Sequence, residues 1–120
     1  MTALSGTEAF PHVSAIAAAA LRAWPDHEKF IRASLGSGDR KFMSRLENVA
    51  TDVVALTGDD LDAFAHDYRW MCEVFREEQF YFARHKKYRR STLEEAIRDI
   101  YGNASYMSRY VNGILLTQVL

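Results

Sequence analysis

The sequence predicts an all-α protein, a compact bundle of five or six helices with one long central helix. Apolar residues recur every three or four positions, and no segment alternates in the way a half-buried strand does. Only two prolines and six glycines interrupt this pattern. With 120 residues, 48% of them hydrophobic, the chain is long enough for one domain with its own core.

The first expected helix runs from about Val13 to Trp24, a segment rich in alanine, which combines high helix propensity with little bulk. Pro25 ends this helix. Because proline suits the first turn of a helix, a second helix is expected to start there and to end at Gly36. Glu28 precedes Arg32 by four residues, the spacing of an ion pair on a helix surface.

A third helix is expected to begin after Asp39, whose side chain can cap it, and to run to about Leu56. Thr57-Gly58 ends it. Helical spacing predicts four inward residues: Phe42, Leu46, Val49 and Val53.

The long central helix is expected to begin near Asp59 or Asp60 and to run to about Tyr88. Its apolar positions follow alternating steps of three and four residues. They are Leu61, Phe64, Tyr68, Met71, Phe75 and Phe82. Further aromatic residues lie off this stripe, so more than one face of the helix is expected to contact protein or ligand.

Ser91 to Glu94 has the spacing of a capping box, which predicts a helix from Thr92 to about Tyr101. Gly102-Asn103 fits a left-handed helix stop. The segment ASYMSRYVNGILLTQVL predicts a last helix. Its expected inward residues are Met107, Tyr110, Val111, Ile114, Leu115 and Val119.

That last helix reaches Leu120 without a glycine stop or a polar tail, so its large apolar side chains would be unprotected without a partner or further chain. Residues 1–120 are therefore expected to be a single helical domain from the N-terminal part of a longer protein, or a chain with an obligate partner. Residues 1–10 are expected to be flexible.

A single cysteine, Cys72, excludes an internal disulfide and favours a reducing compartment, so the cytoplasm is expected. The N-terminus lacks the basic and apolar regions of a signal peptide. The longest apolar run, residues 15–21, is far too short to span a membrane. No membrane partner is expected.

No catalytic residue, metal ligand or cofactor is expected within this chain. Four-helix metal sites use Glu-x-x-His pairs, and none of the histidines follows a Glu by three residues. They are His12, His27, His66 and His85. The glycine pair Gly36-Ser37-Gly38 follows a helix and lacks the lysine of a phosphate-binding loop, so it is interpreted as a linker.

A basic patch follows the aromatic end of the central helix, although the formal net charge of the chain is only −1. Its members are Arg84, Lys86, Lys87, Arg89 and Arg90. Cations in a last helical turn complement the negative end of the helix dipole, which favours a solvated helix end. Phosphate contact is the alternative, but a dedicated nucleic-acid binder usually has a net basic domain.

The most chemically mixed cluster of the last helix is formed by Tyr106, Arg109, Tyr110 and Asn112. These side chains are candidates for lining a pocket that takes an aromatic or acidic small molecule. The other interpretation is that both tyrosines are half-buried between helices while Arg109 reaches water.

The segment YFARHKKYRRSTLEEAIRDIYGNASYMSRYVNGILLTQVL, and above all its tyrosine-rich last helix, resembles the N-terminal helical region of actinobacterial class I S-adenosylmethionine-dependent methyltransferases that act on small natural products. The resemblance covers the last third of the chain. It implies a helical region that precedes a Rossmann-like domain, caps the substrate pocket and mediates dimerisation. S-adenosylmethionine would then bind a glycine-rich turn of that later domain.

The sequence thus predicts a substrate-capping and association domain of a small-molecule methyltransferase, inactive by itself. Its partners would be the C-terminal catalytic domain or a second copy of the chain, together with a small-molecule substrate. A stand-alone helical protein-interaction or dimerisation module is the alternative. Nucleic-acid binding through residues 84–90 is the second alternative.

Overall fold

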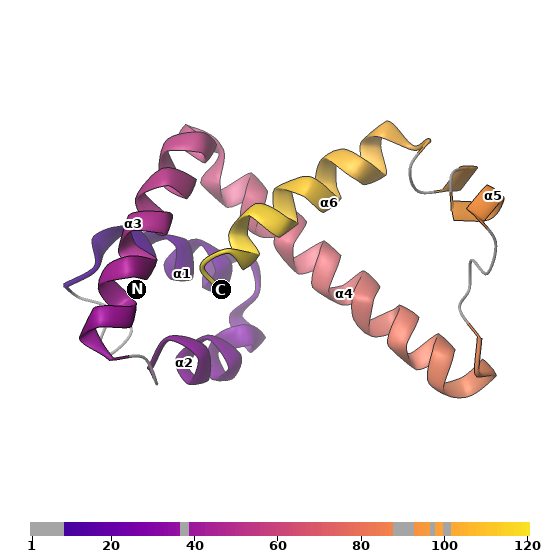
Figure 1. The fold of residues 1–120 in the computed structure, drawn as a ribbon, viewed down its shortest axis with the longest axis horizontal. Coiled ribbons are helices and arrows are strands. Elements are labelled where there is room, and N and C mark those ends of the chain that lie inside the picture. Colours follow the sequence, from indigo (N-terminus) through magenta and orange to yellow (C-terminus); the bar gives the residue numbers. More distant parts are fainter. Residues whose placement is uncertain (1–8, 37–38, 88–92, 97, 100–101) are drawn as a thin grey trace.

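The structure, a computed structural model, describes residues 9–36, 39–87, 93–96, 98–99 and 102–120. These residues contain helices and no strand (Figure 1). The helices are α1 (Pro11–Ala23), η1 (Pro25–His27), α2 (Glu28–Gly36), α3 (Arg40–Thr57), η2 (Gly58–Asp60), α4 (Leu61–His85), α5 (Leu93–Ala96) and α6 (Ala104–Thr117), where η1 and η2 are 3-10 turns. The predicted all-α bundle with one long helix, the 25-residue α4, is confirmed.

Helix α1 begins at Pro11, two residues before the predicted start, because proline occupies the first helical turn without loss of a hydrogen bond. It ends before Trp24, whose backbone N–H donates to the carbonyl of Ala20 at 2.8 Å. Pro25 then opens η1, as its fixed φ angle favours, and α2 follows. The predicted ion pair between Arg32 and Glu28 is present at 2.8 Å.

The predicted cap of α3 is confirmed, because the carboxylate of Asp39 accepts a hydrogen bond from the backbone N–H of Phe42 at 2.7 Å. Gly58 ends α3 with a φ of 53°, a left-handed angle that favours glycine. Helix α4 ends at His85, earlier than the predicted Tyr88, and its C-cap Lys86 has a φ of 59°. Tyr88 itself lies outside the described residues.

The predicted left-handed helix stop at Gly102-Asn103 is wrong for Asn103. Asn103 has an extended backbone, and its side chain accepts a hydrogen bond from the backbone N–H of Tyr106 at 3.0 Å. Asparagine therefore starts α6 as its N-cap. The capping-box positions Ser91 and Thr92 lie outside the described residues, as do residues 1–8 of the predicted flexible segment.

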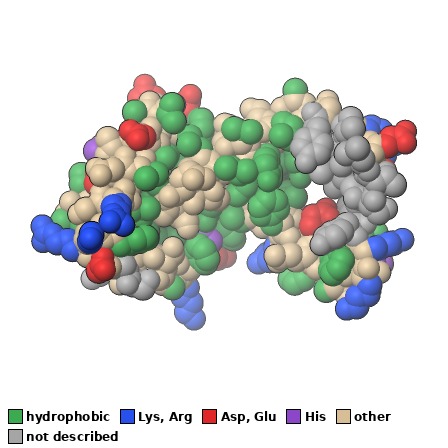
Figure 2. All heavy atoms as spheres, viewed as in Figure 1, with side chains coloured by type: hydrophobic (Ala, Val, Ile, Leu, Met, Phe, Trp, Pro, Cys, Tyr) green, Lys and Arg blue, Asp and Glu red, His purple; other side chains and the backbone are tan. Residues whose placement is uncertain are grey.

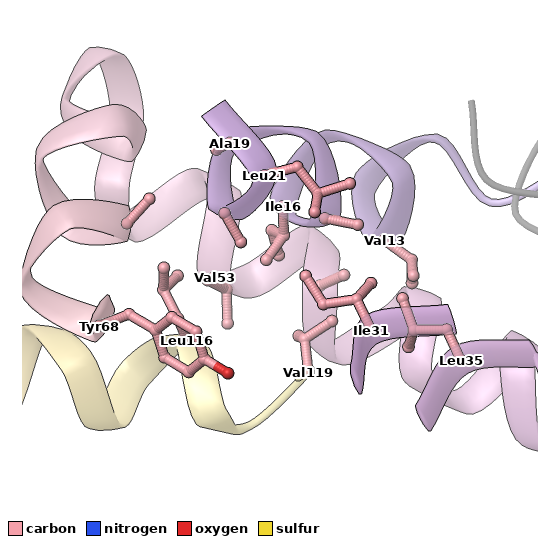
Figure 3. Packing of buried hydrophobic residues seen from close by; sticks show 14 of the residues in the cluster. Val13, Ile16, Ala19, Leu21, Ile31, Leu35, Val53, Tyr68, Leu116 and Val119 are labelled. Atoms are coloured by element: carbon pink, nitrogen blue, oxygen red, sulfur yellow. The ribbon is translucent and has the colours of Figure 1, made fainter. Parts of the chain in front are cut away.

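One core lies where α1 packs against both α3 and α4 and where the end of α6 closes the bundle. Figure 3 shows side chains from these helices and from α2 converging, with Tyr68 beside Leu116 and with Ile31 beside Val119. Four of the six alanines of α1 are buried, so neighbouring helices approach it closely. The largest fully buried side chains are Ile16, Ile31, Leu116 and Val13.

Several large side chains that the spacing places inward are exposed. On α3, Phe42 and Val49 are exposed, while Met43 and Ala50 one position further along are buried against the core. Close packing against the alanine-rich α1 favours that register, which the sizes of the α3 side chains do not reveal. On α6, Val111 is exposed as well.

The apolar C-terminal residues are covered by the chain itself. Leu116 is 0% exposed and Val119 is buried, both in the main core. The prediction that these side chains would lack protection without a partner is therefore wrong. The described helices include none with the length and apolar character that crossing a bilayer requires.

Candidate functional site

Helix α6 crosses the first half of α4 (Figure 1), and the crossing is close because α6 carries a glycine there. A Cβ atom added at Gly113 would lie 3.0 Å from the Cβ of Met71 and 3.1 Å from the backbone oxygen of Asp67. Only a residue without a side chain allows this approach. The crossing fixes where the remaining side chains of α6 lie along α4.

Two of the predicted substrate-lining residues bind the same carboxylate on α4. Asp67 accepts a hydrogen bond from Nε of Arg109 and another from the side-chain amide of Asn112, each at 2.9 Å. The Arg109 guanidinium also lies over the ring of Trp70, 4.5 Å from its centroid. Charge-assisted hydrogen bonds and a cation–π contact thus hold α6 against α4.

The other two predicted residues contact aromatic rings of α4. Tyr106 meets Trp70 edge to face with ring centroids 4.9 Å apart, and Tyr110 meets Phe75 in the same way at 5.9 Å. The structure thus brings all four predicted residues together, in the interface between α4 and α6. Their role in lining a substrate pocket stays a prediction.

Beyond the Phe75 contact, α4 continues away from α6, and we call residues 75–85 the α4 arm (Figure 1). Phe75 and Phe82, which belong to the apolar stripe expected on the central helix, are exposed on this arm. An open hollow of about 590 Å³ lies beside them, and we call it the arm hollow. Its described lining residues are Phe75, Glu78, Gln79 and Phe82.

The opposite side of the α4 arm carries a second aromatic group. Phe80 is 62% exposed there, and the ring of Tyr81 lies 4.2 Å from that of His85. A smaller hollow of about 200 Å³ involves these rings together with Glu77 and Arg84. Both sides of the arm therefore present aromatic surface to solvent.

The basic patch lies at the end of the α4 arm, where Figure 2 shows Lys and Arg side chains gathered. Arg84, Lys86 and Lys87 are exposed, and Lys86 caps the helix. Arg89 and Arg90 lie outside the described residues. This placement is compatible with the predicted solvated helix end, and nucleic-acid binding stays a prediction.

A polar pair that the sequence did not predict lies between η1 and α4. His27 Nε2 lies 2.7 Å from the hydroxyl oxygen of Tyr68, and one of the two groups donates. The imidazole is stacked between the rings of Trp24 and Phe30, with centroids at 4.2 and 4.6 Å. The spacing of three residues from Trp24 to His27 to Phe30 is visible in the sequence, but Tyr68 is too distant along the chain for any spacing to reveal it.

Burial shifts the pKa of both members of this pair. It lowers the pKa of His27, because a desolvated imidazolium is disfavoured, and it raises the pKa of the Tyr68 hydroxyl. It also raises the pKa of Cys72, one turn further along α4. A neutral imidazole, a neutral phenol and a protonated thiol are therefore expected near pH 7. This arrangement stabilises the fold and supplies no activated nucleophile.

On α4, the carboxylate of Glu73 forms an ion pair with Arg69 at 2.6 Å. Within the part of the chain that the structure describes, no three His, Cys, Asp or Glu side chains are grouped in a way that could hold a metal ion. The α4 arm and its hollow are accordingly the strongest candidate for a binding surface. Comparison with known proteins adds no relative, because no protein-family model, no curated protein and no solved structure matches the chain.

Proposed function

We propose that this chain is a helical substrate-capping and association domain of a small-molecule S-adenosylmethionine-dependent methyltransferase. The α4 arm and the facing part of α6 would cover the substrate side of a catalytic domain outside these residues. The observation that carries the proposal is the exposed aromatic surface around the arm hollow.

The physical support comes from the position of these rings. The α4 arm leaves the core and exposes phenylalanine rings to water. Contact with a ligand or partner removes this apolar surface from water, which is favourable. The arm hollow, at about 590 Å³, is within the usual size range of small-molecule sites. Because it is open, another surface is needed to enclose a ligand there.

The chemistry of the lining favours a flat, largely apolar ligand. Phe75 and Phe82 lie two helical turns apart on one face of α4, and Glu78 and Gln79 lie between them. Two rings can stack on an aromatic substrate, while the carboxamide of Gln79 can form hydrogen bonds with its hydroxyl or amino groups. None of the described lining residues performs methyl transfer, so the proposal assigns the cofactor and the reaction to the catalytic domain.

The methyltransferase part of the proposal is supported by the resemblance, which covers residues 81–120. The contact between Phe75 and Tyr110 joins that segment to the arm hollow. The coding sequence beyond Leu120 tests this part directly. A strand followed by a glycine-rich turn is expected there, and a stop codon would contradict it.

The capping part is tested with 8-anilinonaphthalene-1-sulfonate, an aromatic probe whose fluorescence rises in apolar surroundings. We expect the chain to bind the probe and the Phe75→Ser/Phe82→Ser variant to bind it at least several-fold more weakly. Phe42→Ser is the matched control, because Phe42 is an exposed phenylalanine on a different helix. Equal binding by the double variant and the unmodified chain would refute a ligand site at the arm hollow.

A stand-alone protein-interaction module is the second candidate, and Phe80 favours it. This ring is 62% exposed on the side of the α4 arm away from the arm hollow, so capping a substrate does not account for it. Under this alternative, Phe80→Ser weakens capture of a partner protein while probe binding at the arm hollow is unchanged. Under the capping proposal, Phe75→Ser/Phe82→Ser weakens probe binding more than Phe80→Ser does.

A further inference from the structure

Helix α3 carries an apolar line on its outer face that the core does not use. Phe42, Val49 and Leu56 follow one another at intervals of seven residues and are 48%, 41% and 71% exposed. A seven-residue interval returns to nearly the same side of a helix, so the three side chains form one line along α3. The core-facing residues Met43, Ala50 and Val53 lie on an adjacent face of the same helix.

Two opposite charges complete this line. Arg45 lies three residues after Phe42, and Asp52 lies three residues after Val49, so both share the outer face. Both are exposed, and neither forms an ion pair within the described part of the chain. We call the set Phe42, Arg45, Val49, Asp52 and Leu56 the α3 stripe.

The α3 stripe is close to symmetric about Val49. Phe42 and Leu56 lie seven residues before and after it, while Arg45 lies four before and Asp52 three after. Such a helix can pack antiparallel against its own copy, with a two-fold axis at Val49. Phe42 of each copy then faces Leu56 of the other. Each Arg45 then faces Asp52 of the second copy.

We propose that the chain forms a homodimer through this antiparallel α3 contact. The surface fits a second copy because it is self-complementary in both apolar content and charge, as a two-fold interface requires. A helix of 18 residues is about 27 Å long. One helix pair of that length is at the small end of specific interfaces, so a concentration-dependent dimer is expected.

This interface is separate from the surface in the proposed function. Helix α3 lies at the end of the molecule away from the α4 arm (Figure 1). A dimer joined through α3 leaves the arm and its hollow open for a substrate or a catalytic domain. Failure of either proposal therefore leaves the other standing.

Sedimentation velocity of charge-reversed variants tests the pairing. In a two-fold dimer, position 45 of each copy faces position 52 of the other. Arg45→Asp therefore creates two contacts between acidic side chains, and Asp52→Arg creates two contacts between basic side chains. Each variant alone is expected to dimerise at least about tenfold more weakly than the unmodified chain. An equimolar mixture of the two variants restores both opposite-charge contacts, so it is expected to dimerise like the unmodified chain.

Val49→Arg is a second variant, because it places two like charges on the proposed axis without entering the core. It is expected to remain folded by circular dichroism and to sediment as a monomer. Phe80→Ser is the control and is expected to dimerise normally, since its ring lies on the α4 arm.

Three outcomes would overturn the α3 dimer. One is a chain that sediments as a monomer up to about 1 mM, where even very weak specific association is populated. Another is a dimer that survives Val49→Arg. The third is a mixture of Arg45→Asp and Asp52→Arg chains that fails to associate although the unmodified chain does, because that result excludes the antiparallel register.

Discussion

The carboxylate of Glu47 on α3 accepts a hydrogen bond from the backbone N–H of His12 on α1, at 3.0 Å. The same carboxylate accepts from the N–H of Val13 at 2.9 Å and contacts the His12 ring. Helix α1 has no side-chain cap of its own, so Glu47 satisfies two of its free N–H groups and complements its positive end. A residue 35 positions away thereby performs the role of an N-cap and joins α1 to α3.

Glu47→Ala is expected to lower the free energy of unfolding by about 1–2 kcal/mol, the usual cost of removing a helix cap. The loss has this size because the Glu47 side chain is only 17% exposed and water replaces it poorly. Urea denaturation followed by circular dichroism measures the change. Asn48→Ala, an exposed neighbour on α3, serves as the control and is expected to change stability by less than about 0.5 kcal/mol. An equal loss in both variants would mean that the cap contributes nothing.

The same carboxylate predicts how stability depends on acid. Burial alone raises the pKa of Glu47, but hydrogen bonds from the Val13 N–H and from His12 outweigh it, so the pKa of the folded chain is lowered. A lowered pKa means that the folded state binds fewer protons than the unfolded one. The contribution is therefore complete above the unfolded value of about 4.3 and is lost as the pH falls through the folded pKa. Glu47→Gln is expected to flatten this part of the stability profile, and an unchanged slope would contradict the assignment.

A second pH effect is expected from His27. Burial lowers its pKa, so the unfolded chain binds more protons than the folded chain below the ordinary imidazole value of about 6.5. The contribution of His27 to the free energy of unfolding should therefore be constant above about pH 6.5 and should fall as the pH drops below that value. His27→Gln is expected to remove that slope, while His66→Gln, on an exposed histidine of α4, is expected to keep it. Thermal melting between about pH 5 and pH 8 distinguishes the two.

The sequence predicts most helix boundaries because local chemistry determines them. Asp39, Gly58 and Pro25 act through their own backbone or a neighbouring N–H, so their positions can be interpreted without knowing the tertiary structure. Asn103 is the exception, because asparagine fits both a helix start and a left-handed stop. Its role depends on which backbone conformation the surrounding chain selects.

The sequence predicts less well which face of each helix is buried, because burial depends on which helix lies next to it. Periodicity places Phe42 and Val49 in the core, but the close approach of α1 selects a face with smaller side chains. Leu116 is missing from the predicted inward residues and yet is completely buried. The cluster of Tyr106, Arg109, Tyr110 and Asn112 is visible in the sequence as a helix face, whereas its partners on α4 require the crossing geometry.

That crossing gives the last prediction, which compares two glycines that both lie in helices. At Gly113 an added Cβ would approach the Met71 Cβ and the Asp67 backbone oxygen to about 3 Å, and both atoms are held by the rigid backbone of α4. Alanine must therefore push α6 away from α4, which strains the hydrogen bonds to Asp67. This cost outweighs the roughly 1 kcal/mol of helix propensity that alanine gains over glycine.

Gly113→Ala is expected to lower the free energy of unfolding by about 1–2 kcal/mol. At Gly36 no atom lies within 4 Å of an added Cβ and the φ angle is not left-handed, so Gly36→Ala keeps the propensity gain and is expected to stabilise by up to about 1 kcal/mol. Urea denaturation of the two variants side by side makes the comparison. A stabilised Gly113→Ala chain would mean that α6 is free to shift along α4, and the polar contacts of Asp67 would then not fix the crossing.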